Sequence, residues 1–201
     1  MGLLGKVAGH FAVDAIVKTA SKANKKSFNN FFTKKPGTGV LVFVKRKYMW
    51  KDRTDVYGEN KEIKYTVKSE LVSMKHRLYI YDAYDRKIGV VKEKRISLRS
   101  FDFIIEMNDN VIGSVKSIWS FGKKKYKVDF NSWHIKGDVF GWNYKIFNRR
   151  KEIAHISQKL LYFDDIGGMN QSTYVVSFPA PQNEILILML VVALAAGNDP
   201  K

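Results

Sequence analysis

From residue 40 onward, apolar and polar side chains alternate along the chain. In the segment 101–107, for example, Phe101, Phe103 and Ile105 occupy every second position. Alternation with a period of two residues is typical of β-strands that have one buried and one solvated face. About eleven such segments occur, centred near residues 44, 67, 80, 90, 104, 114, 127, 135, 145, 155 and 175. Short turns join most of them, so the pattern predicts an all-β meander.

A short motif recurs in three of these segments, each time just after a turn. The copies are Lys-Ile-Gly-Val-Val-Lys at 87–92, Val-Ile-Gly-Ser-Val-Lys at 111–116 and Glu-Ile-Ala-His-Ile-Ser at 152–157. A glycine or alanine inside a strand indicates that another group passes close to the backbone. The spacings of 24 and 41 residues are too irregular for a propeller or solenoid. The motif therefore favours a barrel built from successive hairpins.

The pattern changes at the C-terminal end, where residues 185–196 are twelve consecutive apolar residues. We expect a helix over 184–197, with Asn183 and Glu184 at its start and Gly197 at its stop. Twelve helical residues span about 18 Å, and a bilayer core requires about 20 residues. A helix that is apolar on all sides must be surrounded, so we predict that it fills the barrel. An anchoring tail is the alternative.

Residues 1–39 form a different region, which we expect to be a basic amphipathic helix followed by a linker. Within 2–23, Lys6, His10, Asp14 and Lys18 recur every four residues, which places them on one side of a helix. Charged residues interrupt every apolar run, so the segment does not match a signal peptide. The helix is expected to pack on the barrel, on a second subunit or on a membrane surface. Residues 40–201 then make up the barrel domain.

Several short segments in this order resemble those of a known family. The residues that carry the resemblance are 65–71, Leu78–Asp82 with Ile88-Gly89, Phe101–Ile105 with Val111-Ile-Gly113, Trp133-His-Ile-Lys-Gly-Asp138 with Gly141 and Tyr144–Ile146, and the terminal apolar helix. Together they resemble the LURP-one-related family, a relative of the tubby C-terminal domain and the phospholipid scramblases. The resemblance implies a closed antiparallel barrel of about twelve strands around a hydrophobic C-terminal helix. Tubby domains bind phosphoinositides through basic surface residues, which have no position-by-position match here.

Composition adds a strong positive charge to this picture. The 201 residues include 35 Lys and Arg, 19 Asp and Glu and no Cys, for a formal net charge of +16. The absence of cysteine excludes disulfide scaffolds, zinc fingers and thiol nucleophiles. Residues 1–39 carry seven lysines and one acid, whereas 152–201 carry two lysines and five acids. Much of the remaining charge sits at outward strand positions, such as Lys64, Lys68, Lys125, Lys127 and Lys136.

Basic clusters are the candidate binding sites. Lys45 and Lys47 share one face of the first strand, Arg149 and Arg150 occupy a hairpin turn, and Lys123-Lys124 occupy another turn. Such clusters attract lipid headgroups and other anions. The alternative is that each cluster is an ordinary solvent-exposed strand face or turn. The candidate anion- or lipid-binding residues are Lys18, Lys22, Lys25, Lys26, Lys34, Lys35, Lys45, Lys47, Arg149 and Arg150.

No catalytic constellation is recognisable in the sequence. His134 and His155 alternate with apolar neighbours and are expected to be ordinary strand residues, and none of the four histidines belongs to a metal-binding motif. Asp164-Asp165 lacks the alternating oxygen ligands of a calcium loop and is expected to form a turn. We therefore expect a non-catalytic protein with no cofactor and no metal.

Three functional hypotheses follow. In the first, the domain binds an anionic membrane surface or phospholipid headgroups through its lysines, as a cytoplasmic protein at the membrane periphery. In the second, it is an intracellular scaffold whose segment 2–23 docks a partner or a second copy. In the third, aromatic residues beside lysines bind nucleic acid; because Tyr126 and Trp133 lie on apolar faces, this hypothesis is disfavoured. The aromatic set for the third hypothesis is Trp119, Phe121, Tyr126, Trp133 and Trp142.

Overall fold

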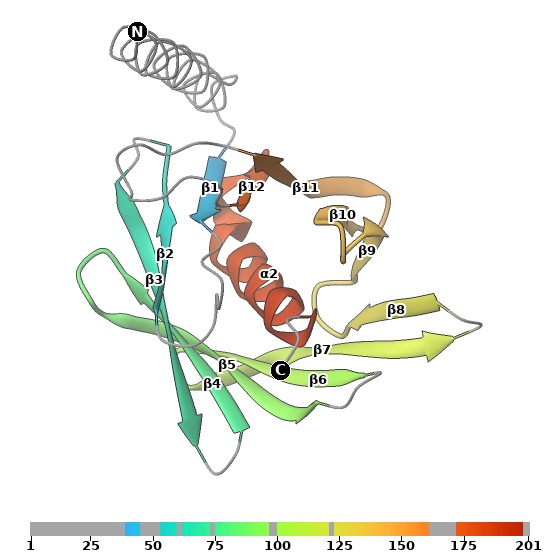
Figure 1. The fold of residues 1–201 in the computed structure, drawn as a ribbon, viewed down its shortest axis with the longest axis horizontal. Helices are drawn as coiled ribbons and strands as arrows, with labels where there is room; N and C mark the ends of the chain where they lie inside the picture. Colours follow the sequence, from blue (N-terminus) through green and yellow to red (C-terminus); the bar gives the residue numbers. More distant parts are fainter. Residues whose placement is uncertain are drawn as a thin grey trace, which may run out of the picture.

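A computed structural model describes residues 39–44, 53–59, 62–72, 75–96, 100–120, 123–160 and 172–198. This part of the chain folds into twelve strands and one long helix (Figure 1). The strands are β1 (Gly39–Val44), β2 (Arg53–Tyr57), β3 (Ile63–Val72), β4 (Lys75–Asp82), β5 (Lys87–Ile96), β6 (Phe101–Met107), β7 (Asn110–Ser120), β8 (Lys123–Val128), β9 (Trp133–Asp138), β10 (Asn143–Asn148), β11 (Lys151–Leu160) and β12 (Ser172–Phe178). A 3-10 turn, η2 (Pro181–Asn183), leads into the helix α2 (Glu184–Asn198).

All twelve strands belong to one antiparallel sheet that curls into a nearly closed barrel. The strand order is β8-β7-β6-β5-β4-β3-β2-β1-β12-β11-β10-β9. The first and last strands pair with each other, with Val42 opposite Val175. The barrel is thus joined where its first and last strands, β1 and β12, pair, and β8 and β9 are left as its edges. The expected full closure is therefore wrong for the described residues, because the sheet stays open between two consecutive strands.

Strand β2 has no counterpart among the eleven segments that alternation predicts. Its inward positions are Thr54 and Val56, and Arg53 and Asp55 alternate with them. Thr54 is buried but polar, so the run Arg-Thr-Asp-Val-Tyr shows only one clearly apolar inward residue. A five-residue strand with one polar inward position is too weak a period to stand out. The first strand also begins at Gly39, one residue inside the expected linker.

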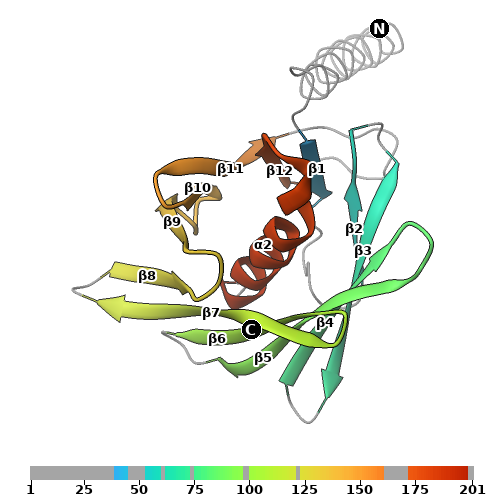
Figure 2. The ribbon, with the colours of Figure 1, turned by 180° about the vertical axis from the view of Figure 1, so that it is seen from behind.

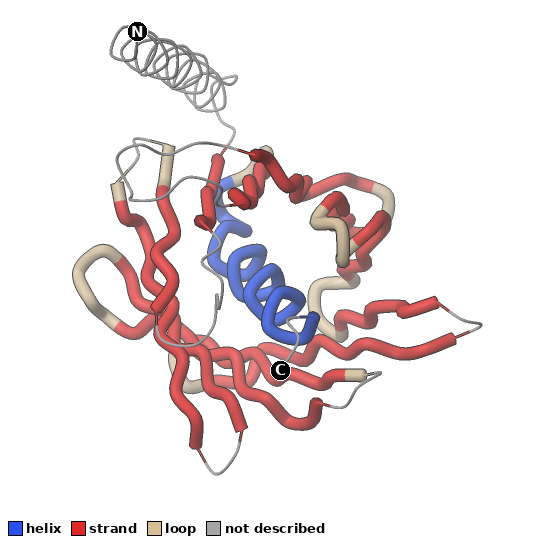
Figure 3. The backbone as a smooth tube through the Cα atoms, in the orientation of Figure 1, coloured by secondary structure: helices blue, strands red, loops and turns tan. Residues whose placement is uncertain are grey.

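Helix α2 confirms the predicted central element. Residues Ile187–Ala195 are 0–3% exposed, and Figure 3 shows the helix inside the ring of strands. The helical stretch Pro181–Asn198 is long and apolar enough to cross a membrane by length and composition alone. Here the strands around it supply the apolar surroundings that such a helix requires. Its inward partners are the alternating residues of the strands, including Phe103, Ile105 and Ile80.

The repeated motif corresponds to a shared shift in strand register. In the β4–β5, β6–β7 and β10–β11 hairpins, Ile80, Ile105 and Ile146 pair with Gly89, Gly113 and Ala154, and the register shifts directly afterwards, as at a β-bulge. The skipped residues are Ile88, Ile112 and Ile153. The expected close approach is present at Gly89, where an added Cβ would lie 2.5 Å from Cε of Met189 in α2.

The β2–β3 hairpin carries the same register shift with a different residue in it. Val56 pairs with Tyr65 and Tyr57 pairs with Ile63, so Lys64 is the skipped residue. The other three hairpins have an apolar isoleucine at this position. The lysine at this position is within reach of the first turn of α2, where it forms an ion pair with Glu184.

The expected N-terminal region lies almost wholly outside the described residues. The amphipathic helix predicted over 2–23 and the linker up to residue 38 belong to the part of the chain that the structure leaves undescribed. The division of the chain at 39/40 into a helix with its linker and a barrel domain stays a prediction; the first described strand, β1, begins at Gly39.

A candidate anion-binding surface

Only Arg149 and Arg150 of the predicted binding residues lie in the described part of the chain. Lys18, Lys22, Lys25, Lys26, Lys34, Lys35, Lys45 and Lys47 fall outside it. The two arginines form the predicted turn between β10 and β11, and both side chains are exposed. Arg149 has a left-handed backbone (φ 54°), and its N–H donates to the carbonyl of Ser132 at 3.4 Å. The turn therefore lies beside the β8–β9 connection.

A larger basic surface lies on the outer side of β4 to β8. The registers place Arg95, Asp102, Lys116 and Lys127 in one row across four strands. A neighbouring row begins with Arg77 opposite Lys92, and Lys125 lies next to Lys127 on the same side of β8. We call the six basic side chains of these rows the basic face: Arg77, Lys92, Arg95, Lys116, Lys125 and Lys127.

Acidic side chains compensate only part of the basic face. Nζ of Lys92 lies 2.5 Å from Glu106, and Nζ of Lys116 lies 3.6 Å from Asp102. A third acid, Asp129, is engaged by the hydroxyl of Ser114 at 2.7 Å. Arg77, Arg95, Lys125 and Lys127 make no ion pair with any described residue. The basic face therefore keeps an excess of positive charge on a continuous strip of sheet.

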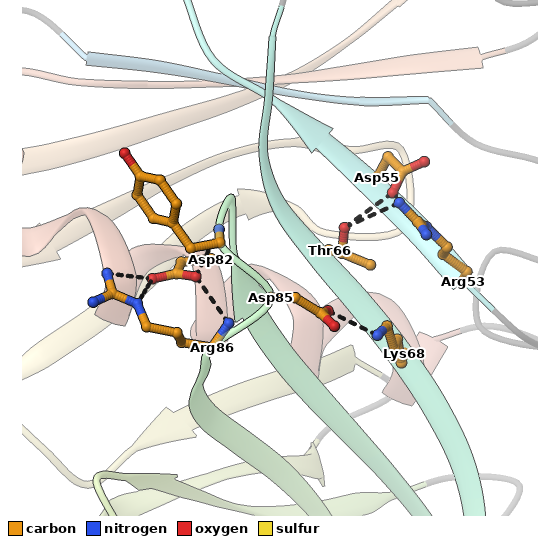
Figure 4. A network of polar contacts seen from close by, with 8 residues as sticks. Arg53, Asp55, Thr66, Lys68, Asp82, Asp85 and Arg86 are labelled. Carbon is orange, nitrogen blue, oxygen red and sulfur yellow. Dashed lines mark hydrogen bonds and ion pairs between the residues drawn. The ribbon is translucent and has the colours of Figure 1, made fainter.

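The neighbouring strands show the opposite arrangement, in which charges are matched (Figure 4). Nε of Arg53 lies 2.8 Å from Asp55, which also accepts a hydrogen bond from Thr66. Lys68 pairs with Asp85 at 2.9 Å. On the β3 side of the basic face, Glu70 stands opposite Arg77. The excess positive charge thus begins at β4 and does not extend toward β2.

Asp82 organises the β4–β5 turn in this matched region. Its carboxylate accepts hydrogen bonds from the backbone N–H groups of Arg86 (3.0 Å) and Tyr84 (2.9 Å) and pairs with the Arg86 guanidinium. The Arg86 backbone hydrogen bond is the largest of the effects that lower the pKa of Asp82. These groups shape a turn, and the carboxylate has no capacity left for a ligand.

Two other basic residues are occupied at the ends of α2. Nζ of Lys64 lies 2.6 Å from Glu184 at the first turn, and the hydroxyl of Tyr65 donates to the same carboxylate at 2.8 Å. At the last turn, Nζ of Lys124 donates to Oδ1 of Asn198 at 2.8 Å. Burial lowers the pKa of Lys124. Both contacts fix the helix in the barrel, so neither lysine belongs to the basic face.

The predicted position of Lys123-Lys124 is wrong. Both residues lie in strand β8, not in a turn, and Lys124 pairs with Trp119 across the hairpin. The sequence pattern correctly gave the outward direction of Lys125 and Lys127. It could not show that Lys127 stands beside Lys116, because that contact depends on the register between two strands.

A shallow hollow of about 250 Å³ lies above β5 and the β6–β7 turn. Lys87 and Asp109 line it and form an ion pair at 3.3 Å, and Glu106 and Asn108 complete its polar wall. Its charges are mixed and matched, so it does not resemble a site for an anion. Within the described ranges, no group of three or more His, Asp or Glu side chains is placed to hold a metal ion.

The aromatic residues considered for nucleic acid do not form one platform. Trp133 is 3% exposed and belongs to the core, and the ring of Trp142 stacks on Tyr174 with centroids 3.8 Å apart. Tyr126 donates to Asn198 at 3.2 Å. Trp119 alone of the four described candidates presents a large exposed surface, 52%. Phe121 falls outside the described residues.

The histidines sit among strand residues as expected. His134 stacks on Phe147 with centroids 5.3 Å apart, and His155 lies 3.4 Å from the side chain of Asn143. Both imidazoles therefore contact neighbouring residues of the sheet.

Comparison with known proteins agrees with the fold. The family model described as LURP-one-related matches residues 40–195. The chain is also similar to an X-ray structure of a protein from Arabidopsis thaliana, with a TM-score of 0.51 and 12% sequence identity, over 80% of this chain and 92% of that chain. At that identity the similarity concerns the fold alone. A comparison with curated proteins finds no match.

Proposed function

Because the chain belongs to the LURP-one-related family, and because that membership specifies a fold without an activity, we propose a function from the surface itself: a non-catalytic domain that binds anionic phospholipid at a membrane surface. The observation that carries the proposal is the basic face. Six basic side chains stand there against Glu70, Asp102, Glu106 and Asp129, and four of the six form no ion pair with a described residue.

The expected strength of such binding follows from the charge. A basic residue near an anionic leaflet contributes about 1 kcal/mol. Six basic groups and four acidic groups, with Glu70 opposite Arg77 included, leave a net excess of two, hence about 2 kcal/mol from the basic face. Binding of this kind is weak, sensitive to salt and suited to a peripheral protein. The lysines of residues 1–39 are a second source of attraction to an anionic leaflet. The location that matches this function is the cytoplasm, at the membrane periphery.

The test is co-sedimentation of the full chain with vesicles. We expect binding to phosphatidylcholine vesicles that contain phosphatidylserine, little binding to phosphatidylcholine alone, and release at high salt. Equal binding to both kinds of vesicle, or to neither, would contradict the proposal. If the chain binds neither kind of vesicle, self-association or binding of a protein partner through residues 2–23 becomes the favoured function.

Variants locate the binding surface. The triple change Arg95→Gln, Lys125→Gln and Lys127→Gln removes three unpaired charges from the basic face. Its matched control, Arg149→Gln, Arg150→Gln and Lys151→Gln, removes three exposed charges from the β10–β11 turn. We expect the first variant to weaken vesicle binding at least tenfold, or about 1.4 kcal/mol, and the control to weaken it by less. If the control weakens vesicle binding more than the first variant does, the binding site lies at the β10–β11 turn and not on the basic face.

A third variant addresses the N-terminal region within the intact chain. It changes the six lysines Lys18, Lys22, Lys25, Lys26, Lys34 and Lys35 to Gln. If this variant alone abolishes binding while the basic-face variant binds normally, the basic face is not the site.

A further inference from the structure

The β7–β8 hairpin carries exposed apolar side chains next to the basic face. Ile118 is 47% exposed and Trp119 is 52% exposed, near the C-terminal end of β7. Ile118 pairs with Lys125 and Trp119 pairs with Lys124 across the hairpin. In Figures 1 and 2 this hairpin extends beyond the end of β6, away from α2. The hairpin therefore offers apolar surface at a projecting position of the barrel.

The two apolar side chains lie on opposite faces of the hairpin. Consecutive strand residues point to opposite sides, so Ile118 shares the outer side with Lys125 and Lys127, and Trp119 points to the other side. A partner that covers one face, such as a protein groove or a stacked base, would bury only one of them. A medium that surrounds the ribbon would bury both. The interfacial layer of a lipid bilayer is such a medium.

The chemistry of the flanking residues fits the same partner. Tryptophan is enriched at membrane interfaces because its ring is apolar and its N–H remains hydrated. Lys125 and Lys127 lie on the outer side of the hairpin, where their charges complement anionic headgroups. β7 and β8 pair with each other from Val115–Val128 to Ser120–Lys123, which satisfies the backbone groups on their facing edges. The free edge of β8 limits insertion to the hydrated headgroup region.

We propose that the β7–β8 hairpin is the membrane-inserting element of this protein, with Ile118 and Trp119 entering the interfacial layer of an anionic leaflet while Lys125 and Lys127 contact its headgroups. This inference rests on the proposed lipid-binding function and adds to it an inserted element and an orientation. The barrel would then approach the membrane with the end of the sheet that bears this hairpin.

Fluorescence with brominated lipids tests the insertion. Vesicles of phosphatidylserine and brominated phosphatidylcholine should quench the tryptophan emission of the wild-type chain, and Trp119→Phe should remove most of that quenching while it preserves binding. Trp119→Ser and Ile118→Ser should each weaken vesicle binding, by about tenfold for the tryptophan. Because both side chains are about half exposed, we expect the variants to have nearly the same unfolding free energy in urea as the wild-type chain.

The matched control is Val111→Ser, which removes an exposed apolar side chain (66% exposed) from the opposite end of the same strand. It should leave vesicle binding unchanged. If the wild-type chain binds anionic vesicles but Trp119→Ser behaves like Val111→Ser and quenching survives Trp119→Phe, insertion is refuted and the lipid-binding function stands. If the wild-type chain binds no vesicle, the proposed function itself fails. Binding of a polynucleotide with quenching of Trp119, in place of vesicle binding, would also overturn the inference.

Discussion

The hydroxyl of Tyr65 on β3 donates a 2.8 Å hydrogen bond to the carboxylate of Glu184, at the first turn of the central helix. These residues are 119 positions apart, and both are buried. Lys64, the residue before Tyr65, completes the contact with an ion pair at 2.6 Å. Negative charge is favourable at a helix N-terminus. The start of α2 is thus fixed to the barrel wall by two consecutive residues of one strand.

Removing that hydroxyl should destabilise the fold. Tyr65→Phe leaves the ring in place but deprives the Glu184 carboxylate of a hydrogen bond, so we expect a loss of about 2 kcal/mol of unfolding free energy, measured by urea denaturation. Tyr81→Phe on the adjacent strand is the control, because its hydroxyl makes no hydrogen bond with a described residue. Equal stability of the two variants would show that the contact with Glu184 contributes nothing.

A second tyrosine should respond in the opposite way. The side chain of Tyr144 is 1% exposed, and its hydroxyl has no hydrogen-bond partner among the described residues. A buried polar group without a partner costs about 1–3 kcal/mol. Tyr144→Phe is therefore expected to be neutral or to raise the unfolding free energy by about 1 kcal/mol. A loss as large as that of Tyr65→Phe would mean that the hydroxyl is bonded in solution.

Alkaline pH should weaken the fold through its buried tyrosines. Burial raises the pKa of Tyr126 to about 12, and it also raises the pKa of Tyr65. In the unfolded chain a tyrosine has a pKa of about 10. Above that pH the unfolded state releases protons that the folded state retains, so stability is complete below about pH 10 and is lost as the pH rises toward about 12.

The measurement is the unfolding free energy as a function of pH in this range. Tyr126→Phe should reduce the slope, because it removes one of the titrating groups. An unchanged slope would assign the alkaline loss to other residues.

Close packing of α2 against β5 gives a further prediction. An added Cβ at Gly89 would lie 2.5 Å from Cε of Met189 and 2.9 Å from the backbone oxygen of Glu106. Gly89→Ala should therefore cost about 1–3 kcal/mol in a urea unfolding experiment. Gly58→Ala is the control, since its Cβ would meet the end of the Glu62 side chain, which is exposed and free to rotate. If Gly89→Ala loses no more unfolding free energy than Gly58→Ala, the helix moves to accommodate the added methyl group and the prediction is wrong.

The sequence predicted the strands and the helix because their periods are strong. Phe101, Phe103 and Ile105 are buried as the alternation indicates, and α2 lies within one residue of the expected range at its end. Strand β2 was missed because Thr54 is polar at an inward position. The opening between β8 and β9 has no counterpart in the pattern, since alternation specifies faces but not which strands pair.

The candidate surface was harder to predict for the same reason. Sequence clusters such as Arg149-Arg150 are visible along the chain, whereas Arg95, Lys116 and Lys127 are neighbours only across strands. Lys64 was expected to be an ordinary outward lysine, but the register shift in its hairpin places it against Glu184. Cross-strand register, which the sequence pattern does not contain, decided both outcomes.

Lysine acetylation, followed by mass spectrometry with and without anionic vesicles, examines every candidate lysine at once in the intact protein and so locates the membrane-binding surface directly. If the basic face binds the membrane, vesicles will protect Lys125 and Lys127 and leave Lys145 and Lys151 as reactive as before. Protection confined to Lys151 and its neighbours, or to the lysines of residues 1–39, or no protection under conditions in which the protein binds, would contradict this prediction.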